Sequence, residues 1–317
     1  MKCFVGGEKG RVIYMAYNLD KKLVVGISSR ALFDLRVENE IFEQAGVNAY
    51  ADYQREHETE ILKPGPGFGI IRALLSLNKV KNREGRVEVI VMSRNSADTS
   101  LRVFNSITYY NLEITRAVLA SGASLAPYLN AFKTDLFLSA YEDDVQSAVN
   151  SNIAAGIICS DGVHTYDYEK EVRPIRIAFD GDAVLFSNES EKIFQEEGLE
   201  AFEENERKNA KNPLQAGPFA KFLKTLSDLQ QEFQGEEAWI RTALVTARSA
   251  PAHERVIRTL RAWNVRVDEA FFLGGVSKAE VLKAFGANIY FDDQLVHTTA
   301  ASEVVPSARV PVQMESY

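Results

Sequence analysis

Short apolar runs alternate along this chain with longer stretches in which apolar residues recur every three or four positions. The runs have the length of buried strands, and they lie at residues 23–27, 87–92, 117–119, 136–138, 175–179, 242–245, 270–273 and 287–291. The periodic stretches indicate amphipathic helices, as over residues 252–263, where Val256, Leu260 and Trp263 share one stripe. Strands that alternate with helices predict an α/β fold in which right-handed crossovers connect a parallel sheet.

Polar residues follow the last four of these runs. They are, in chain order, Asp180 with Asp182, then Thr246, then Lys278, then Asp292 with Asp293. Because the carboxyl ends of parallel strands line one edge of a sheet, where ligands bind, we expect these side chains to gather there. Each residue alone has an ordinary explanation, as a turn residue, a helix cap or a solvated lysine. Their joint occurrence at four successive strand ends favours a functional site.

The segment Asp180-Gly181-Asp182 has the character of a metal and phosphate site. Side chains two residues apart on an extended chain point the same way, so the two carboxylates can converge just past the strand. Gly181 leaves the backbone between them open to a ligand. Carboxylates beside bare backbone amides suit a hard cation together with a phosphate. The alternative is a polar turn of the kind that ends many strands.

The order of these residues resembles the haloacid dehalogenase superfamily of phosphohydrolases, which use an Asp-x-Asp pair, then Ser or Thr, then Lys, then an acidic pair. Residues 179–187 (Phe-Asp-Gly-Asp-Ala-Val-Leu-Phe-Ser), 244–250 (Leu-Val-Thr-Ala-Arg-Ser-Ala) and 291–293 (Phe-Asp-Asp) are similar to motifs of the cytosolic 5'-nucleotidase type I family. Residues 28–33 and 64–66 are similar to that family as well. The resemblance therefore spans nearly the whole chain.

The resemblance implies an enzyme that hydrolyses nucleoside 5'-monophosphates, with AMP favoured, to a nucleoside and phosphate. Asp180 would be the nucleophile and would form an aspartyl-phosphate. Asp182 would protonate the leaving 5'-oxygen and then activate water. Gly181, Thr246 and Lys278 would bind the phosphate.

The resemblance also implies Mg²⁺ as cofactor. Asp180 and Asp292 would ligate the ion with their carboxylates, and Asp182 would ligate it with its backbone carbonyl. Asp293 would either contact the ion or lie behind the ligands. A carboxylate at Asp292 could instead only cap a turn.

An acidic, helix-prone segment, about 187–234, is inserted between the first two strands of the second half. In the superfamily an insertion at this place forms a cap over the active site, which implies that part of the base and ribose recognition lies here. Phe186 and Phe194 could stack on a base, although aromatic residues at such positions are more often part of a core.

The two halves of the chain repeat each other in sequence register. Identical residues recur at an offset of 152 and then, after a shift of one residue, at 153; examples are Gly46 and Gly198, Gly65-Pro66 and Gly217-Pro218, and Arg102-Val103 and Arg255-Val256. A constant offset over more than a hundred residues indicates an internal duplication. We therefore predict two Rossmann-like, haloacid dehalogenase-like units, over residues 1–160 and 161–317, with the cap in the second.

The register assigns the chemistry to the second unit. The residues opposite Asp180, Asp182, Thr246, Lys278 and Asp292 are Ser28, Arg30, Ser93, Leu125 and Ser139. The first unit therefore lacks the metal carboxylates and the lysine. It is either structural, which we favour, or it contributes residues such as Arg30 and Arg94 to a shared cleft.

Composition narrows the functional class. The chain has 317 residues, 46% of them hydrophobic, and a net charge of −8. An acidic balance argues against binding to nucleic-acid polymers, which needs a basic face. Two cysteines are too few for a disulfide framework. No run has the length of a signal peptide core or a membrane span, so we expect a cytoplasmic protein with no membrane partner. The oligomeric state stays open and includes a homo-oligomer.

Three functions remain after these exclusions. The first is a nucleoside 5'-monophosphate phosphohydrolase, and the second is a phosphatase of the same chemistry that acts on another small phosphomonoester. The third is a nucleotide-binding protein without catalysis, against which the complete set of strand-end residues argues. The four histidines show no metal-binding spacing, although His297 lies near Asp292 in sequence. The chain has no Walker-type loop, which argues against ATP-driven chemistry.

Overall fold

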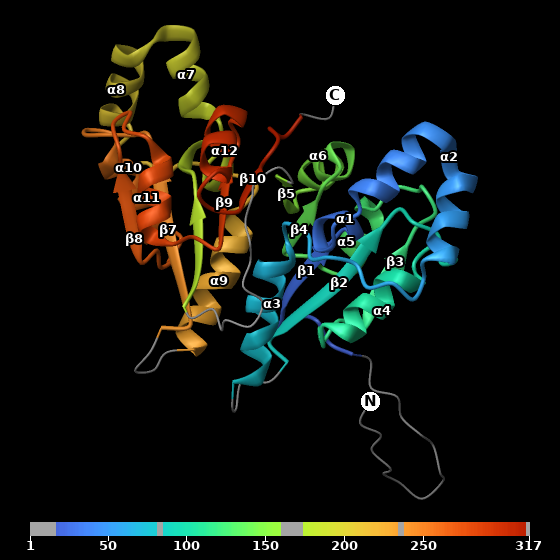
Figure 1. The fold of residues 1–317 in the computed structure, drawn as a ribbon. Coiled ribbons are helices and arrows are strands. Elements are labelled where there is room, and N and C mark those ends of the chain that lie inside the picture. The colour runs from blue at the N-terminus through green and yellow to red at the C-terminus, as the bar shows by residue number, and fades with distance from the viewer. Residues whose placement is uncertain (1–16, 81–84, 160–173, 234–237, 315–317) are drawn as a thin grey trace, which may run out of the picture.

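The computed structural model describes residues 17–80, 85–159, 174–233 and 238–314. Within these ranges the strands form a ten-stranded sheet with the spatial order β3-β2-β1-β4-β5-β10-β9-β6-β7-β8 (Figure 1). All neighbouring strands are parallel except β5 and β10. The strands are β1 (Leu23–Ile27), β2 (Val87–Ser93), β3 (Arg116–Leu119), β4 (Leu136–Ser139), β5 (Ala154–Ile158), β6 (Ile175–Phe179), β7 (Ile240–Thr246), β8 (Glu269–Phe272), β9 (Ile289–Asp292) and β10 (Ser307–Arg309).

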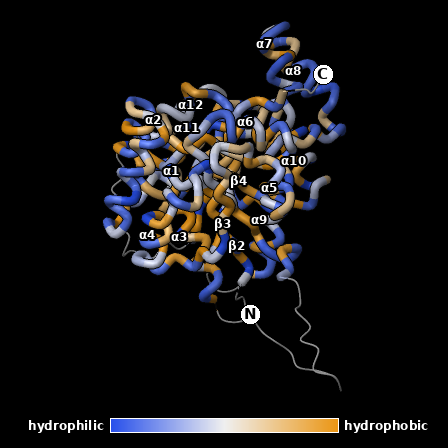
Figure 2. The backbone as a smooth tube through the Cα atoms, turned by 90° about the vertical axis from the view of Figure 1, so that its right-hand side faces the viewer, coloured by the Kyte–Doolittle hydropathy of each residue, from blue (hydrophilic) through white to orange (hydrophobic). Residues whose placement is uncertain are grey.

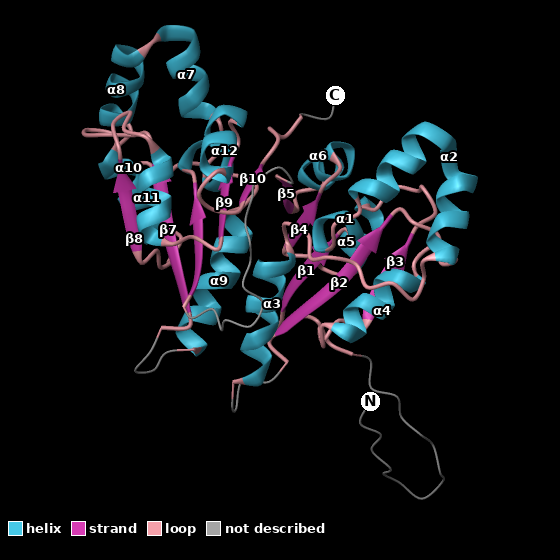
Figure 3. Ribbon diagram, in the orientation of Figure 1, coloured by secondary structure: helices cyan, strands magenta, loops and turns pink. Residues whose placement is uncertain are grey.

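Helices connect the strands and cover the sheet (Figure 3). Among the described residues, no helix is both long and apolar enough to cross a membrane. The helices are α1 (Ser29–Leu32), α2 (Arg36–Glu56), α3 (Phe68–Ser76), α4 (Leu101–Tyr109), α5 (Ala126–Ala131), α6 (Glu142–Asn150), α7 (Glu189–Glu197), α8 (Leu199–Lys208), α9 (Ala220–Glu232), α10 (His253–Ala262), α11 (Lys278–Phe285) and α12 (Leu295–Ser302).

The strands are mainly apolar because helices cover both of their faces, although β2 contains Glu88 and β7 contains Thr242. Along β1, Val25 packs into one core cluster and Val24 into another, since successive side chains point to opposite faces. The same alternation in β6 sends Ile177 to one cluster and Ala178 to a third. Apolar residues are concentrated in the central strands, whereas α7 and α8 are mainly hydrophilic (Figure 2). This explains why uninterrupted apolar runs predicted strands.

The core on one face of the sheet continues across both halves of the chain. Leu74 of α3 and Phe222 of α9 belong to the same buried cluster, and α3 contacts β6. On the opposite face each half has a cluster of its own, built by α5 and α6 in the first half and by α11 and α12 in the second. The two halves are therefore joined by one shared core layer and by the pairing of β5 with β10.

The two halves have the same internal order of strands. From edge to centre the first half reads β3-β2-β1-β4-β5 and the second reads β8-β7-β6-β9-β10. Individual hydrogen bonds recur at corresponding positions. Leu62 N donates to Ser106 Oγ at 2.9 Å, and Leu214 N donates to Thr259 Oγ1 at 2.9 Å. These pairs differ by the offsets of 152 and 153 residues that the sequence shows.

All eight strands that the sequence predicts are present, and the α/β class with a mostly parallel sheet is confirmed. Strands β5 and β10 were not predicted, because β5 begins with small residues and β10 has only three residues. Helix α2 was also missed, since residues 37–63 read only as a polar and acidic stretch. The predicted boundary between residues 160 and 161 lies outside the described residues.

The predicted cap segment 187–234 divides into two parts. Helices α7 and α8 project beyond the sheet (Figure 1), and Gly198, with a φ of 86°, separates them. Glycine suits this break because it adopts positive φ without a steric penalty. Helix α9 instead packs against the sheet with buried Phe222, Leu223 and Leu226. In the first half, helix α2 occupies the place that corresponds to α7 and α8. It is kinked at Gly46, the counterpart of Gly198, where φ is 82°.

Candidate active site

The candidate site lies where β6, β7 and β9 end, because these strands are neighbours in the sheet. The pairing of Phe179 with Phe291 places the next residues, Asp180 and Asp292, side by side. Lys278, at the start of α11, lies between them. Its Nζ is 2.9 Å from Asp180 Oδ1 and 2.7 Å from Asp292 Oδ2. Lys278 is thus in direct contact with Asp180, 98 positions before it in the sequence, as the parallel-sheet rule predicted.

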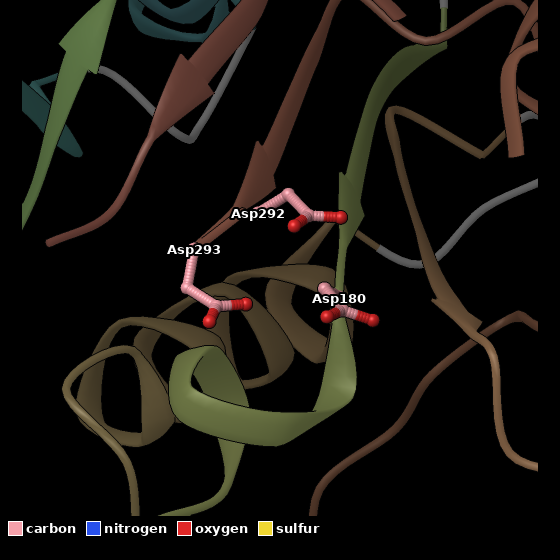
Figure 4. A group of neighbouring side chains, drawn as sticks. All are labelled: Asp180, Asp292 and Asp293. Atoms are coloured by element: carbon pink, nitrogen blue, oxygen red, sulfur yellow. The ribbon is translucent and has the colours of Figure 1, made fainter. Parts of the chain in front are cut away.

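Three carboxylates form a compact group at this edge. Asp180, Asp292 and Asp293 each offer one oxygen, and these oxygens lie within 4.8 Å of one another (Figure 4). With Lys278 included, the group carries three negative charges and one positive charge when all are ionised. Hard oxygen ligands with an excess of negative charge suit a divalent cation such as Mg²⁺. The donor set therefore fits the metal that the sequence predicts.

The pKa values in this group are displaced in opposite directions. Burial, opposed by Lys278 and assisted by the charge of Asp292, raises the pKa of Asp180 well above its usual range. Burial and the charge of Asp292 raise the pKa of Asp293 to about 7. Burial would also raise the pKa of Asp292, but His297, Lys278 and Tyr290 outweigh it and lower that pKa to about 2. Asp292 is thus the carboxylate most firmly held in its ionised form.

Asp292 is surrounded by donors that the sequence analysis left unassigned. Tyr290, wholly buried, donates its hydroxyl to Asp292 Oδ2, and His297 Nδ1 lies 3.3 Å from the same oxygen. The backbone amide of Gln294 donates to Asp292 Oδ1 at 2.8 Å. The sequence signal for Tyr290 is its place two residues before Asp292, since alternate residues of a strand share a face.

Thr246 ends β7 beside the turn that follows Asp180. Its Oγ1 accepts a hydrogen bond from the amide of Arg248 at 3.2 Å. A Cβ added to Gly181 would lie 3.3 Å from this oxygen, so the backbone of Gly181 approaches the threonine side chain closely. The three residues predicted from the sequence to bind phosphate, Gly181, Thr246 and Lys278, therefore lie around one end of β6.

Asp182 does not belong to the compact group of three carboxylates. Arg248 holds it with two hydrogen bonds, from Nε to Oδ2 at 2.8 Å and from Nη2 to Oδ1 at 2.6 Å. The third nitrogen of the same guanidinium reaches Glu206 of α8 at 2.6 Å. Sequence reasoning missed Arg248 and Glu206, although Arg248 stands within the motif around Thr246.

The model of the 5'-nucleotidase family matches residues 15–317. The chain belongs to the 5'-nucleotidase family. Cytosolic 5'-nucleotidase 1B from Homo sapiens is 36% identical over 292 residues, which cover 89% of this chain and 47% of that protein. The chain thus spans about half the length of this curated relative. The family resemblance drawn from the motifs is confirmed.

One solved structure is similar over 90% of this chain and 79% of its own: histidinol dehydrogenase from Elizabethkingia anophelis. Its TM-score of 0.22 and sequence identity of 8% are too low to indicate a shared fold.

In this member of the 5'-nucleotidase family, the first half has hydroxyls where the second has Asp180 and Asp292. Ser28 Oγ accepts from Ala31 N at 3.2 Å, and Ser139 Oγ accepts from Tyr141 N at 3.1 Å. Leu125, which stands opposite Lys278, is buried in an apolar cluster. These residues cap their own loops and pack, and they have no carboxylate or ammonium group.

Two further sequence candidates have contacts elsewhere. Arg30 donates to Asn39 at 2.7 Å and lies over the ring of Tyr141, both in the first half. Phe186 is wholly buried and packs near Trp263, so it belongs to the core. Phe194 of α7 is 45% exposed, and it is therefore the one of the two proposed aromatic residues that a ligand could reach.

Proposed function

We propose that this protein hydrolyses nucleoside 5'-monophosphates, with AMP favoured, in a Mg²⁺-dependent reaction that passes through an aspartyl-phosphate. The observation that carries the proposal is the contact of Lys278 with both Asp180 and Asp292 beside Asp293. Family membership supports the reaction class. A carboxylate nucleophile, a cation for the transferring oxygens and a set of metal ligands are what phosphoryl transfer requires.

Asp180, Asp292 and Asp293 would hold the Mg²⁺ with their carboxylates, and the backbone carbonyl of Asp182 would add a ligand. When bound, the ion would neutralise charge on the phosphate and on the aspartates. The excess negative charge of the group and the raised pKa of Asp293 support this assignment, because both indicate carboxylates that lack a counter-charge.

In the first step, a carboxylate oxygen of Asp180 attacks phosphorus, and the bond from phosphorus to the 5'-oxygen breaks. The leaving oxygen takes a proton from Asp182, so that a neutral nucleoside departs. Lys278, Thr246 and the backbone amides near Gly181 hold the transferring oxygens. The buried position of Asp180 keeps this carboxylate away from bulk water.

In the second step, a water oxygen attacks phosphorus and gives its proton to Asp182. The bond between phosphorus and the Asp180 oxygen breaks, which releases inorganic phosphate and restores both aspartates. Asp182 thus begins and ends the cycle in the same protonation state. The cytosolic location in the name of the human relative supports an intracellular substrate pool for this reaction.

We also infer that the chain consists of two haloacid dehalogenase-like units derived from a duplication, only the second of which is catalytic. The shared strand order, the constant offset and the recurring hydrogen bonds of Leu62 and Leu214 support this. Helices α7 and α8 would form the cap over the catalytic unit. The hydroxyls of Ser28 and Ser139 support a structural role for the first unit.

The deciding experiment is phosphate release from a panel of nucleoside monophosphates and sugar phosphates, with Mg²⁺ and with EDTA. Release from AMP or IMP that requires Mg²⁺ supports the proposal. Hydrolysis of sugar phosphates but of no nucleotide would keep the mechanism and replace the substrate. Binding of nucleotides without any release of phosphate would favour a non-catalytic protein.

A further inference from the structure

A chain of four charged side chains, three of them buried, joins the catalytic turn to helix α8. Asp182, Arg248, Glu206 and Arg255 follow one another through direct ion pairs, so that positive and negative charges alternate and balance. The side chains of Arg248, Glu206 and Arg255 are at most 5% exposed, whereas that of Asp182 is 16% exposed. Only the end of the chain that faces the proposed chemistry is therefore accessible to solvent.

Arg248 is the centre of this chain. Its guanidinium binds both oxygens of Asp182, at 2.8 and 2.6 Å, and its remaining nitrogen binds Glu206 Oε2 at 2.6 Å. A fork of this kind fixes the plane of the carboxylate, because the guanidinium is rigid and planar. Each carboxylate oxygen keeps a second lone pair for another partner. Asp182 is thus oriented by Arg248 without being fully occupied.

Glu206 is held by more than Arg248. Its Oε1 accepts from Arg255 at 2.9 Å and from Ser190 Oγ at 2.9 Å, and the residue is wholly buried. Glu206 belongs to α8 and Ser190 to α7, so both helices of the projecting hairpin are tied to this carboxylate. The hairpin is therefore connected to the Asp182 side chain through Glu206 and Arg248.

The counterparts of these four residues in the first half indicate which of them the fold itself needs. Arg102, the counterpart of Arg255, is also buried and is neutralised by Glu38 at 2.6 Å. A carboxylate thus neutralises this arginine in both halves: Glu38 for Arg102 and Glu206 for Arg255. The two carboxylates stand at different positions of the repeat, since the counterpart of Glu38 is Ser190.

The remaining counterparts lack the charges. Asn95 stands opposite Arg248, and Gln54 stands opposite Glu206. The first half nevertheless forms the same strands and a comparable kinked helix, α2. Arg248 and Glu206 are thus dispensable for this architecture, and they occur in the half that contains the aspartates.

We propose that Arg248 is a positioning residue that orients Asp182 for proton transfer and links this orientation to helix α8 through Glu206. The inference rests on the proposed phosphohydrolase function, in which Asp182 serves the leaving group. Arg248 acts through Asp182 and need not touch the substrate.

The test compares substrates that differ in their need for a proton. A nucleoside monophosphate has an alkoxide leaving group that requires protonation, whereas p-nitrophenyl phosphate releases a stable phenolate. Arg248→Lys keeps the charge and removes the fork. We compare kcat/KM, which covers the steps up to release of the leaving group and excludes the shared hydrolysis of the aspartyl-phosphate. We expect kcat/KM for AMP to fall by about 10- to 100-fold, the cost of misplacing a catalytic group, and kcat/KM for p-nitrophenyl phosphate to fall by less than about 3-fold.

Two further variants complete the design. Glu206→Gln removes the anchor of Arg248 with a residue that the first half already has at this position, and we expect the same selective loss to a smaller extent. Arg102→Lys is the matched control, because it alters an equally buried ion pair far along the chain from Asp182. It should lower the melting temperature and leave the ratio of the two kcat/KM values unchanged.

Equal losses for both substrates in Arg248→Lys and Glu206→Gln would overturn the inference, since they would indicate a structural role. An unchanged ratio in Glu206→Gln, should Arg248→Lys fail to fold, would overturn the link to α8. Failure of the proposed function is distinguishable: wild-type protein would then hydrolyse no nucleotide, and a sugar phosphate with its alkoxide leaving group would replace AMP in the comparison.

Discussion

The hydroxyl of Tyr290 hydrogen-bonds to the carboxylate of Asp292, two residues further along the same strand. Both side chains are wholly buried. The counterpart of Tyr290 in the first half is Phe137, which is also wholly buried, and the residue two positions after it is Ser139 instead of an aspartate. The hydroxyl is therefore present only in the half that has the candidate metal ligand, whereas an aromatic ring without a hydroxyl is enough to fill the core at this position.

Tyr290→Phe should weaken metal binding and leave the fold intact. Groups that hydrogen-bond to a metal ligand fix its orientation, and their loss costs about 10- to 100-fold in metal affinity or activity. Phe137 indicates that a phenylalanine ring fits this place. We expect a higher Mg²⁺ concentration for half-maximal activity and a smaller Mg²⁺-induced shift in melting temperature. An unchanged Mg²⁺ titration would show that the hydroxyl only fills the core.

Asp180→Asn should abolish turnover without destabilising the protein. The amide cannot form the aspartyl-phosphate, so kcat should fall by about 10³-fold or more. Burial disfavours the ionised carboxylate at this position, as its raised pKa indicates, and Lys278 keeps Asp292 as a partner. Ser28→Ala, at the corresponding place in the first half, should change kcat by less than about 2-fold. Near-normal turnover in Asp180→Asn would remove this residue as the nucleophile.

Asp292→Asn separates a role as metal ligand from a role as the cap of a turn. Asparagine can still accept the hydrogen bond from the amide of Gln294, but it lacks the charge that contacts Lys278 and would ligate Mg²⁺. A ligand role predicts a strongly raised Mg²⁺ requirement and partial recovery of the rate at high Mg²⁺. A pure capping role predicts an unchanged Mg²⁺ titration with at most about 1 kcal/mol of lost stability.

Asp293 should make the stability of the metal-free protein depend on pH. Its pKa is raised to about 7 in the folded protein, whereas an aspartate in an unfolded chain has a pKa of about 3.9. The folded state then binds the proton more tightly, so the contribution is fully present below about pH 4 and is lost as the pH rises through about 7.

The comparison with Asp293→Asn in denaturant unfolding isolates this contribution. In EDTA, the free energy of unfolding of the wild type should decrease relative to the variant between about pH 4 and about pH 8. A difference between the two proteins that stays constant over this range would show that Asp293 is not perturbed in the folded state.

The sequence by itself determined the fold class and the central part of the candidate site. Mainly apolar runs predicted eight strands, because a strand covered on both faces buries most of its side chains. Asp180, Lys278 and Asp292 were expected together, since parallel strands bring their carboxyl ends to one edge. The family was also recognisable, because the strand-end motifs are contiguous in the chain.

Only the tertiary structure decided the partners that lie between these elements. Asp182 and Arg248 are 66 positions apart, and Arg248 and Glu206 are 42 apart. A charged residue in the sequence does not reveal its partner, because ion pairs depend on where helices such as α8 pack over the strand ends. The same limit applies to β5 and β10, whose antiparallel pairing joins the two halves. Their short, weakly patterned segments become strands through the neighbours that bind them, since edge-to-edge hydrogen bonding is a property of the assembled sheet.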